Sequence, residues 1–430
     1  TRGAVRHRAH AHARPTPDPL GRGRPGAPGP APARGPDRAD ASAQARDVLE
    51  SLVYALLESG RLDRALALTE TFPADGPGAL DDARAAALRT RLAWAAVSAA
   101  RTADAAAQVA LVRDLLQRFD GTAHTPALDV VESRLVLGGA TGDPAADDRT
   151  AEAERLARRA ARRAEQHGQP VIACQAWQLL AVLERRHGFD RADLCLERIL
   201  SIATRHALPI WRVDALLRLG VNAFMRDGSS SRLEQAHRAA RELAAPDLVS
   251  SAEATLAMQA VLRGDYPAAR ELTGRCLEST ARRRNVDQHQ FALLTRAAAA
   301  AHQGRRAEME RDLAEFERWD DGAQSLQRPL VHGNCRAICA LLEEERDLAA
   351  RELDSALRWE EQNPTVFYLN GRFGLRLLLR AMDGTADPAD HAAGAADHAA
   401  ALAWNRQFER LAHAVHLGRA GRGAEAAEAV

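Results

Sequence analysis

His332, Cys335 and Cys339 are the residues whose types and spacing come closest to a metal site. On an α-helix, residues three, four and seven apart share a face, and one imidazole with two thiolates suits zinc. No fourth ligand is evident, and Ile338 and Leu342 predict that this face belongs to the core. Because free cysteine often serves as a small buried hydrophobe, the favoured interpretation is structural, and no metal ligand is predicted.

Nucleotide-binding and catalytic motifs are missing or lack their structural setting. The segment Gly21-x-Gly23-x-x-Gly26 matches the letters of a dinucleotide fingerprint, but no strand precedes it and Pro25 interrupts it. The chain has no lysine for a phosphate-binding loop, and it has neither a GxSxG nor an HExxH motif. We therefore predict no catalytic residue, no cofactor-binding residue and no enzyme. A helical lyase-like enzyme is the alternative, and it would need a convergent acid–base set.

Runs of like charge are a second group of candidate sites. Arg282–Arg284, Glu343–Glu345 and the arginines at 158, 159, 162 and 163 stand in helical patterns with opposite charges nearby. Pairs of opposite charge four residues apart are typical of solvated helix faces, so this is the favoured interpretation. A role for Arg282–Arg284 in binding a phosphate or a partner is the alternative.

The aromatic residues allow two interpretations. Trp94, Trp177 and Trp211 lie within apolar helical stripes, which predicts core packing. Trp359 and the Phe367-Tyr368 pair are denser and could line a ligand pocket, although packing between adjacent hairpins is favoured.

Composition limits the class of protein. Apolar residues make up 46% of the 430 residues and aromatic residues only 4%, and the helix formers Ala, Leu, Arg and Glu dominate after about residue 41. The formal net charge of zero argues against a broad nucleic-acid footprint. Five sparse cysteines without a CxxC motif fit a reduced cytoplasmic setting. No apolar run is long enough to span a membrane.

Residues 1–40 differ from the rest of the chain. They are rich in Pro, Gly, Ala and Arg, and they contain few apolar residues to bury. Such a composition is typical of disorder. We therefore expect a solvated tail at 1–40 and a folded helical domain at 41–430, and weak contact between the arginines of the tail and an acidic partner is the alternative.

A repeat organises the folded part. A glycine or arginine turn between two apolar helical patterns recurs every 36 to 46 residues. The turn positions are Gly60, Arg101, Gly142, Gly188, Gly228, Gly264, Gly304, Arg346, Gly384 and Gly421. A period of about 40 with hairpin content indicates an all-α superhelical solenoid of antiparallel helix hairpins, like tetratricopeptide repeats.

Local sequence supports this organisation. Glycine adopts the left-handed conformation that ends a helix, Asp265 is placed to cap the next helix, and Pro267 suits its first turn. Ser231–Glu234 and Ser250–Glu253 have capping-box spacing, which predicts two further helix starts. The apolar residues from Val48 to Leu56 are predicted to form one buried stripe.

The C-terminal third resembles a known family. The segments that carry the resemblance are Trp359-Glu-Glu-Gln-Asn-Pro364, Phe367-Tyr-Leu-Asn-Gly371, Gly374-Leu-Arg-Leu-Leu-Leu379, Trp404-Asn-Arg406 and Ala412-His-Ala-Val-His-Leu-Gly-Arg-Ala-Gly421. This succession is similar to the tetratricopeptide-like region of actinobacterial LuxR-family large ATP-binding transcriptional regulators. The resemblance extends over roughly residues 45–430.

The resemblance implies a regulatory or sensor arm. In that family a nucleotide-binding domain precedes the repeats and a helix-turn-helix follows them, and neither is found in this sequence. ATP is accordingly expected only in the missing domain, and this segment is not expected to bind DNA. The arm would bind a small-molecule effector, a protein partner or a second copy of itself on the solenoid surface. A stand-alone adaptor for protein–protein interaction is the alternative.

Overall fold

The structure, a computed structural model, describes residues 38–73, 76, 78–99, 101–138, 146–283, 285–318, 325, 327–362, 374–385 and 403–429. Within these ranges every regular element is a helix and no strand occurs. Helix α1 begins at Arg38, close to the boundary expected at residue 41, and nearly all of the expected tail lies outside the described residues.

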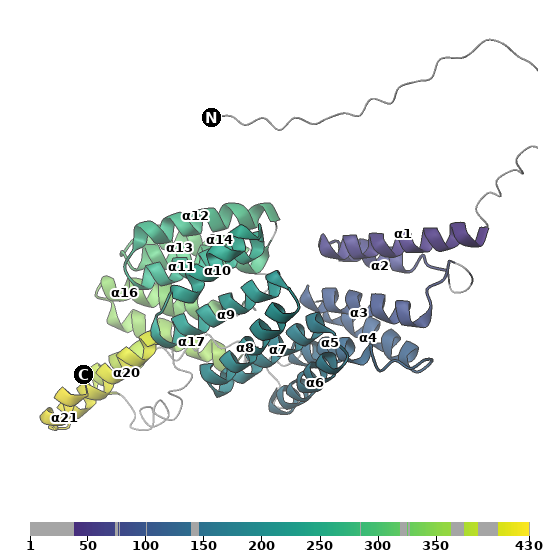
Figure 1. The fold of residues 1–430 in the computed structure, drawn as a ribbon. Coiled ribbons are helices and arrows are strands. Elements are labelled where there is room, and N and C mark those ends of the chain that lie inside the picture. The colour runs from purple at the N-terminus through teal and green to yellow at the C-terminus, as the bar shows by residue number, and fades with distance from the viewer. Residues whose placement is uncertain are drawn as a thin grey trace, which may run out of the picture.

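The helices form consecutive hairpins (Figure 1). The first helices of the hairpins are α1 (Arg38–Glu58), α3 (Asp82–Ser98), α5 (Thr125–Gly138), α7 (Pro170–Glu184), α9 (Pro209–Asp227), α11 (Pro246–Leu262), α13 (Val286–Ala301), the run α15–η2–α16 (Arg328–Leu330, Val331–Ala337, Ile338–Leu342), α18 (Gly374–Asp383) and α20 (Ala403–Arg419). The second helices are α2 (Leu62–Thr69), α4 (Thr102–Leu116), α6 (Ala146–Gln166), α8 (Phe189–Arg205), α10 (Ser231–Glu242), α12 (Tyr266–Arg283), α14 (Arg306–Arg318), α17 (Arg346–Gln362) and α21 (Gly423–Glu428). A short 3₁₀ turn, η1 (Arg185–His187), joins α7 to α8.

The turn after α11 shows how the chain reverses. Gly264 has a φ of +78°, and the Asp265 amide donates to the Ala260 carbonyl at 2.8 Å, which closes the helix end. The Asp265 carboxylate then accepts from the Ala268 amide at 3.2 Å, and Pro267 occupies the first turn of α12. These predicted roles are confirmed. Of the predicted turn positions, only Gly142 lies outside the described residues.

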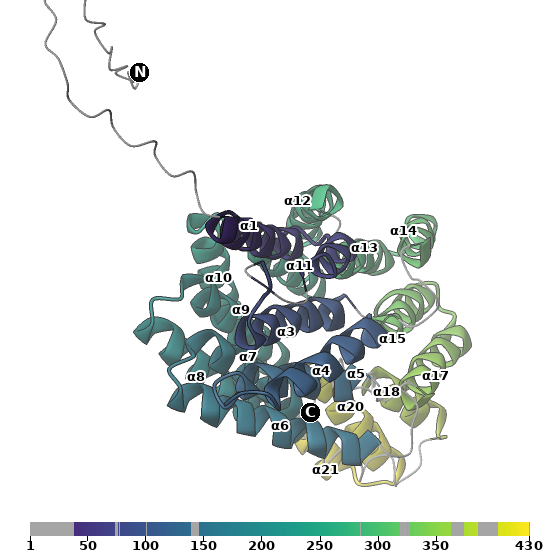
Figure 2. The same ribbon diagram turned by 90° about the vertical axis from the view of Figure 1, so that its right-hand side faces the viewer.

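The hairpins stack into a curved array. Each second helix packs against its own first helix, and α8, α10 and α12 also pack against the first helix of the next hairpin. First helices contact one another directly, as α9 contacts α11 and α11 contacts α13. In Figure 2, α8, α10, α12 and α14 lie at the periphery, and α9, α11 and α13 lie nearer the middle. In this part of the chain, the first helices α9, α11 and α13 therefore form the inner surface of the superhelix.

Small residues make this close stacking possible. Ala192 and Ala269, which follow two of the turns, are completely buried. Gly220 in α9 lies so close to α10 that an added Cβ would be 2.7 Å from the backbone nitrogen of Leu233. The array thus depends on alanine and glycine at its helix crossings, in keeping with the low aromatic content.

Buried ion pairs join the helices within a hairpin. The Arg159 guanidinium on α6 donates to both oxygens of Asp129 on α5, at 2.6 and 2.7 Å. Arg296 on α13 binds Asp312 on α14 in the same bidentate way, at 2.9 and 3.0 Å. Both aspartates are 2% exposed, so each depends on its arginine for compensation.

One local prediction is wrong, and two hold only in part. Helix α10 begins at Ser231, as predicted, but its cap residue is Ser230, which makes no capping side-chain hydrogen bond. Ser250–Glu253 lies inside α11, which begins at Pro246. In the stripe of α1, Val53 and Leu56 are buried as predicted. Val48 is 67% and Leu52 46% exposed, because α1 is the first described helix and no earlier described hairpin covers this face.

A long-range contact interrupts the pattern of neighbour-only packing. Helix α20 touches α9, and the Arg406 guanidinium donates a hydrogen bond to the carbonyl oxygen of Arg226, 180 residues earlier. The described C-terminal hairpin thus meets the middle of the array. Among the described residues, no helix combines the length and the apolar character needed to cross a bilayer.

Buried His289 leads to a pH prediction. The residue is 5% exposed, and its Nδ1 lies 3.0 Å from the Thr280 hydroxyl. Burial lowers the pKa of His289 below the ordinary 6.5, an effect that the carboxylate of Glu315 opposes and Arg296 reinforces. The fold therefore favours the neutral ring, and this contribution to stability is present above about pH 6.5 and is lost as the pH falls through the lowered pKa.

We expect the melting temperature of the native chain to fall more between pH 7.5 and pH 5 than that of His289→Gln, as measured by circular dichroism. Exposed His206→Gln is the control and should follow the native chain. Equal pH dependence in His289→Gln and the native chain would contradict the prediction.

Candidate functional site

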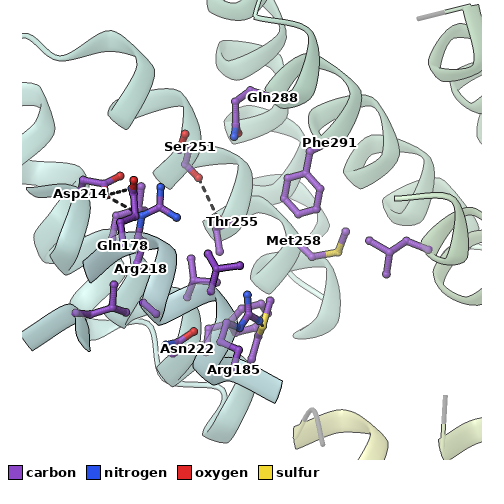
Figure 3. Close-up of a pocket in the computed structure, with 18 of the residues that line it drawn as sticks. Gln178, Arg185, Asp214, Arg218, Asn222, Ser251, Thr255, Met258, Gln288 and Phe291 are labelled. Carbon is purple, nitrogen blue, oxygen red and sulfur yellow. Dashed lines mark hydrogen bonds and ion pairs between the residues drawn. The ribbon is translucent and has the colours of Figure 1, made fainter. Parts of the chain in front are cut away.

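A cavity of about 340 Å³ opens on the inner surface of the superhelix. Its walls come from the first helices of consecutive hairpins, namely α7 with η1, α9, α11, α13 and the α15–η2 run, together with Leu196 of α8. Helix α9 contributes seven of the lining residues, and each of the other elements contributes between one and three. The cavity therefore exists because the hairpins curve, and no single repeat contains it (Figure 3).

One polar wall is built on α7 and α9. The Asp214 carboxylate accepts from the Arg218 guanidinium at 2.7 Å and from the Gln178 side-chain amide at 2.9 Å. Asp214 and Arg218 stand one turn apart on α9, so the helix itself holds the pair in place. Within this group the charges of Asp214 and Arg218 cancel.

Arg185 is the second cation at the cavity. Its partly buried guanidinium lies 5.5 Å from the centre of the Phe189 ring, and Nη2 lies 2.9 Å from the sulfur of Met225. No described carboxylate forms an ion pair with it. Burial lowers the pKa of Arg185 to about 10, with the positive charge of Arg218 acting in the same direction and Asp193 partly opposing the shift. Arg185 nevertheless remains charged at neutral pH.

The opposite wall mixes apolar and polar side chains, and its polar members are Ser251, Thr255, Gln288 and Asn334. Met258 of α11, Phe291 of α13 and Leu330 of α15 face the space across from Arg185, as Figure 3 shows for Met258 and Phe291. Thr255 lies between the two walls, and its hydroxyl donates to the carbonyl oxygen of Ser251 at 3.0 Å. The cavity thus combines a cation on one side with the apolar side chains of Met258, Phe291 and Leu330, among polar ones, on the other.

Asn222 connects the cavity to the outer helix α8. It is 3% exposed, and its amide donates to the Asp193 carboxylate at 2.7 Å. Asp193 also binds Arg226 at 3.1 Å, and Arg226 is the residue whose carbonyl accepts from Arg406 of α20. A chain of hydrogen bonds therefore runs from the cavity wall to the C-terminal hairpin.

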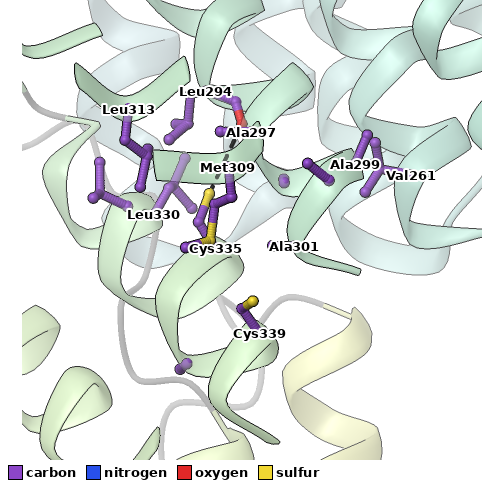
Figure 4. Packing of buried hydrophobic residues seen from close by; sticks show 14 of the residues in the cluster. Val261, Leu294, Ala297, Ala299, Ala301, Met309, Leu313, Leu330, Cys335 and Cys339 are labelled. Atoms are coloured by element: carbon purple, nitrogen blue, oxygen red, sulfur yellow. Dashed lines mark hydrogen bonds between the residues drawn. The ribbon is translucent and has the colours of Figure 1, made fainter. Parts of the chain in front are cut away.

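The His332, Cys335 and Cys339 group does not form a ligand set. His332 Nδ1 lies 2.7 Å from a Glu352 oxygen, and Cys335 is buried with its sulfur 3.9 Å from the Leu294 carbonyl (Figure 4). Burial raises the pKa of both thiols. Among the described residues, no group of three His, Cys, Asp or Glu side chains is placed to hold a metal ion.

Several members of the predicted charge runs are engaged in ion pairs. Arg282 pairs with Glu278 one turn earlier, and Glu343 binds Arg306 of α14 at 2.9 Å. Arg158 and Arg159 bind Glu154 and Asp129 respectively. The side chains of residues 283 and 284 lie outside the described part, so the alternative role of Arg282–Arg284 stays a prediction.

Some of the predicted roles of the aromatic residues are confirmed, and one lies outside the described residues. Trp94, Trp177 and Trp211 are partly buried and pack against the cores of the first half, which confirms their structural role. Trp359 is partly buried on α17. The Phe367-Tyr368 pair lies outside the described residues, so the pocket expected there stays a prediction.

Sequence reasoning missed the cavity between α7 and α13. Its lining residues are spread from Gln178 to Asn334, and each looks like an ordinary residue of an amphipathic helix. Arg185 stands in a basic stretch before a glycine turn, and this context is typical of the charged end of a helix. The one available signal was that no acidic residue stands three or four positions from Arg185 on either side, so the helix offers it no partner of opposite charge.

Comparison with known proteins bears on the fold. No family model and no curated protein matches the sequence. Similar solved structures include a Rap protein complexed with competence and sporulation factor, with a TM-score of 0.50, 12% identity and coverage of 89% of this chain and 99% of that chain.

Two other solved structures are less similar. Yeast Tom70 has a TM-score of 0.39, 12% identity and coverage of 89% and 83%. A signal-transduction ATPase with a tetratricopeptide-repeat sensor from Pyrococcus horikoshii has a TM-score of 0.31, 13% identity and coverage of 74% and 42%. At these identities the comparisons concern the fold alone. Together with the hairpin array, the likeness to the Rap protein shows a superhelical solenoid of tetratricopeptide-like helix hairpins.

Proposed function

We propose that the chain is the ligand-binding sensor arm of a regulatory protein, and that the ligand binds in the inner cavity. The observation that carries the proposal is the cavity itself, about 340 Å³ in volume and lined by the first helices of consecutive hairpins. This volume is in the range of small-molecule sites, which are mostly apolar with a few convergent polar groups. A ligand that touches several hairpins at once would bias the curvature of the array.

Two further facts support this role. Helical solenoids present extended concave surfaces on which partners bind. The similar Rap structure is itself a complex with a competence and sporulation factor, so an array of this architecture can hold a ligand. The proposal includes no catalytic step and no cofactor in this chain, and it places the protein in the cytoplasm.

The test is a thermal-shift screen of the full chain against short peptides and small metabolites, repeated with Thr255→Trp. Saturation at a hundred times the dissociation constant stabilises a protein by about 2.7 kcal/mol, so true ligands should raise the melting temperature. The tryptophan should fill the cavity and abolish these shifts. Ile210→Trp adds the same side chain at a 49% exposed position and should retain them. Shifts that survive in Thr255→Trp would place binding elsewhere.

The regulator we propose is of the LuxR type, in keeping with the sequence resemblance. The DNA that flanks the coding region distinguishes this proposal from a stand-alone adaptor. A nucleotide-binding module upstream and a helix-turn-helix downstream, in frame, would support the regulator. An in-frame start and stop that enclose only the repeats would favour the adaptor.

A further inference from the structure

The cavity carries an excess of positive charge. Its described charged lining residues are Arg185, Arg218 and Asp214, and the Arg218–Asp214 pair is neutral. One positive charge, that of Arg185, is left without a carboxylate partner among the described residues. A partly buried charge is normally paired, because its transfer from water is costly. An incoming anion would supply the missing partner.

The hydrogen-bonding capacity of Arg185 supports this view. A guanidinium has five N–H donors in a planar fork. Arg185 uses one nitrogen on the Met225 sulfur, a weak acceptor, and it lies against the Phe189 ring. No strong oxygen acceptor among the described residues bonds to its guanidinium. The remaining donors suit the two oxygens of a carboxylate, which arginine binds in a bidentate geometry.

The rest of the cavity indicates what the anion is attached to. Met258, Phe291 and Leu330 are the apolar residues of the wall across from Arg185, which also includes the polar residues Gln288 and Asn334. Because the charged lining residues of the cavity sum to one positive charge, a singly charged anion is favoured over a phosphate dianion. A ligand with a carboxylate at one end and an apolar body at the other would match both walls.

We infer that the inner cavity binds a carboxylate joined to an apolar body, with Arg185 binding the carboxylate and Met258 and Phe291 contacting the apolar part. This inference rests on the proposed function, since it assigns a ligand class to the same site. Two sources share this chemistry, namely the C-terminus of a short apolar peptide and a free aryl or alkyl carboxylic acid.

The experiment compares a peptide acid with its neutral amide, and with a small carboxylic acid. Isothermal titration of the full chain with N-acetyl-Leu-Phe, with its C-terminal amide and with 4-phenylbutanoate distinguishes the two sources. We expect at least one of the two acids to bind, and we expect the amide to bind at least tenfold more weakly than the peptide acid. Stronger binding of the peptide acid than of phenylbutanoate would identify a peptide ligand, and the reverse would identify a small acid.

Substitutions at one position then test the role of Arg185. Arg185→Met should lower the affinity for the acid to that for the amide, whereas Arg185→Lys should retain part of it. Arg232→Met removes a charge from an exposed position on α10 and should leave both affinities unchanged. The melting temperature of Arg185→Met should not fall, because an uncompensated charge is removed, which separates a binding role from a structural one.

Three outcomes would overturn the inference. These are equal binding of acid and amide, acid binding that survives in Arg185→Met, and no binding of any probe at millimolar concentration. Equal binding of acid and amide that is lost in Thr255→Trp would still support the cavity as a ligand site. The experiments can thus contradict the proposed ligand class without contradicting the proposed ligand-binding function.

Discussion

Replacing Arg159 by methionine is expected to lower the free energy of unfolding by about 3–5 kcal/mol, the largest effect we predict for any single change. Arg159 binds both oxygens of Asp129, which is 2% exposed. Methionine fills a similar space but leaves the carboxylate without compensation. Chemical denaturation followed by circular dichroism measures the loss.

Two further variants show whether the uncompensated charge is the cause. Arg155→Met removes an arginine from the same helix whose side chain is 59% exposed and pairs with Glu152, so it should cost at most about 1 kcal/mol. The double variant Asp129→Leu, Arg159→Met should recover much of the loss, because no charge stays buried. A double variant as unstable as Arg159→Met alone would show that packing, rather than charge, accounts for the effect.

Gly220→Ala is expected to destabilise the fold by about 1–3 kcal/mol. A glycine in a helix interior is ordinarily less stable than alanine by roughly 0.5–1 kcal/mol, so the usual sign is reversed here. The reason is the crossing of α9 and α10, where the new Cβ would lie 2.7 Å from the Leu233 nitrogen and 2.9 Å from its Cγ. The backbone would have to shift to relieve this contact.

Gly274→Ala in α12 is the matched control. An added Cβ there meets nothing within 4 Å, so this variant should gain roughly 0.5–1 kcal/mol from helix propensity. Opposite shifts in the denaturation midpoints of the two variants are the expected result. A stabilised Gly220→Ala would mean that the α9–α10 crossing is looser than the structure indicates.

The hairpin architecture was predictable because its signals are local. A left-handed residue at a helix end strongly favours glycine, and Gly60, Gly188 and Gly264 all have positive φ angles at the predicted turns. Apolar periodicity then places the helices between these turns. Capping boxes were a weaker guide, since Ser250 and Glu253 have a spacing that fits a helix interior equally well.

The cavity and the zinc-like group depend on features that local patterns do not contain. The curvature that brings Gln178 near Phe291 accumulates over several helix crossings, and small changes at each would move the walls apart. The spacing of His332 and Cys335 assumed an α-helix, but Val331–Ala337 is a π-helix. Its wider turn rotates residues three apart away from a common face.

The contact of α20 with α9 changes how the stability of the array has to be described. In a stack of repeats, unfolding is usually treated as a one-dimensional sum of intrinsic and nearest-neighbour energies. The hydrogen bond from Arg406 to the Arg226 carbonyl adds an interaction energy between two hairpins that are not neighbours in the stack. The hairpins between them form a closed loop, so fraying at the C-terminal end must first break this contact, and the segment from α9 to α20 should melt more cooperatively than a linear stack of the same length.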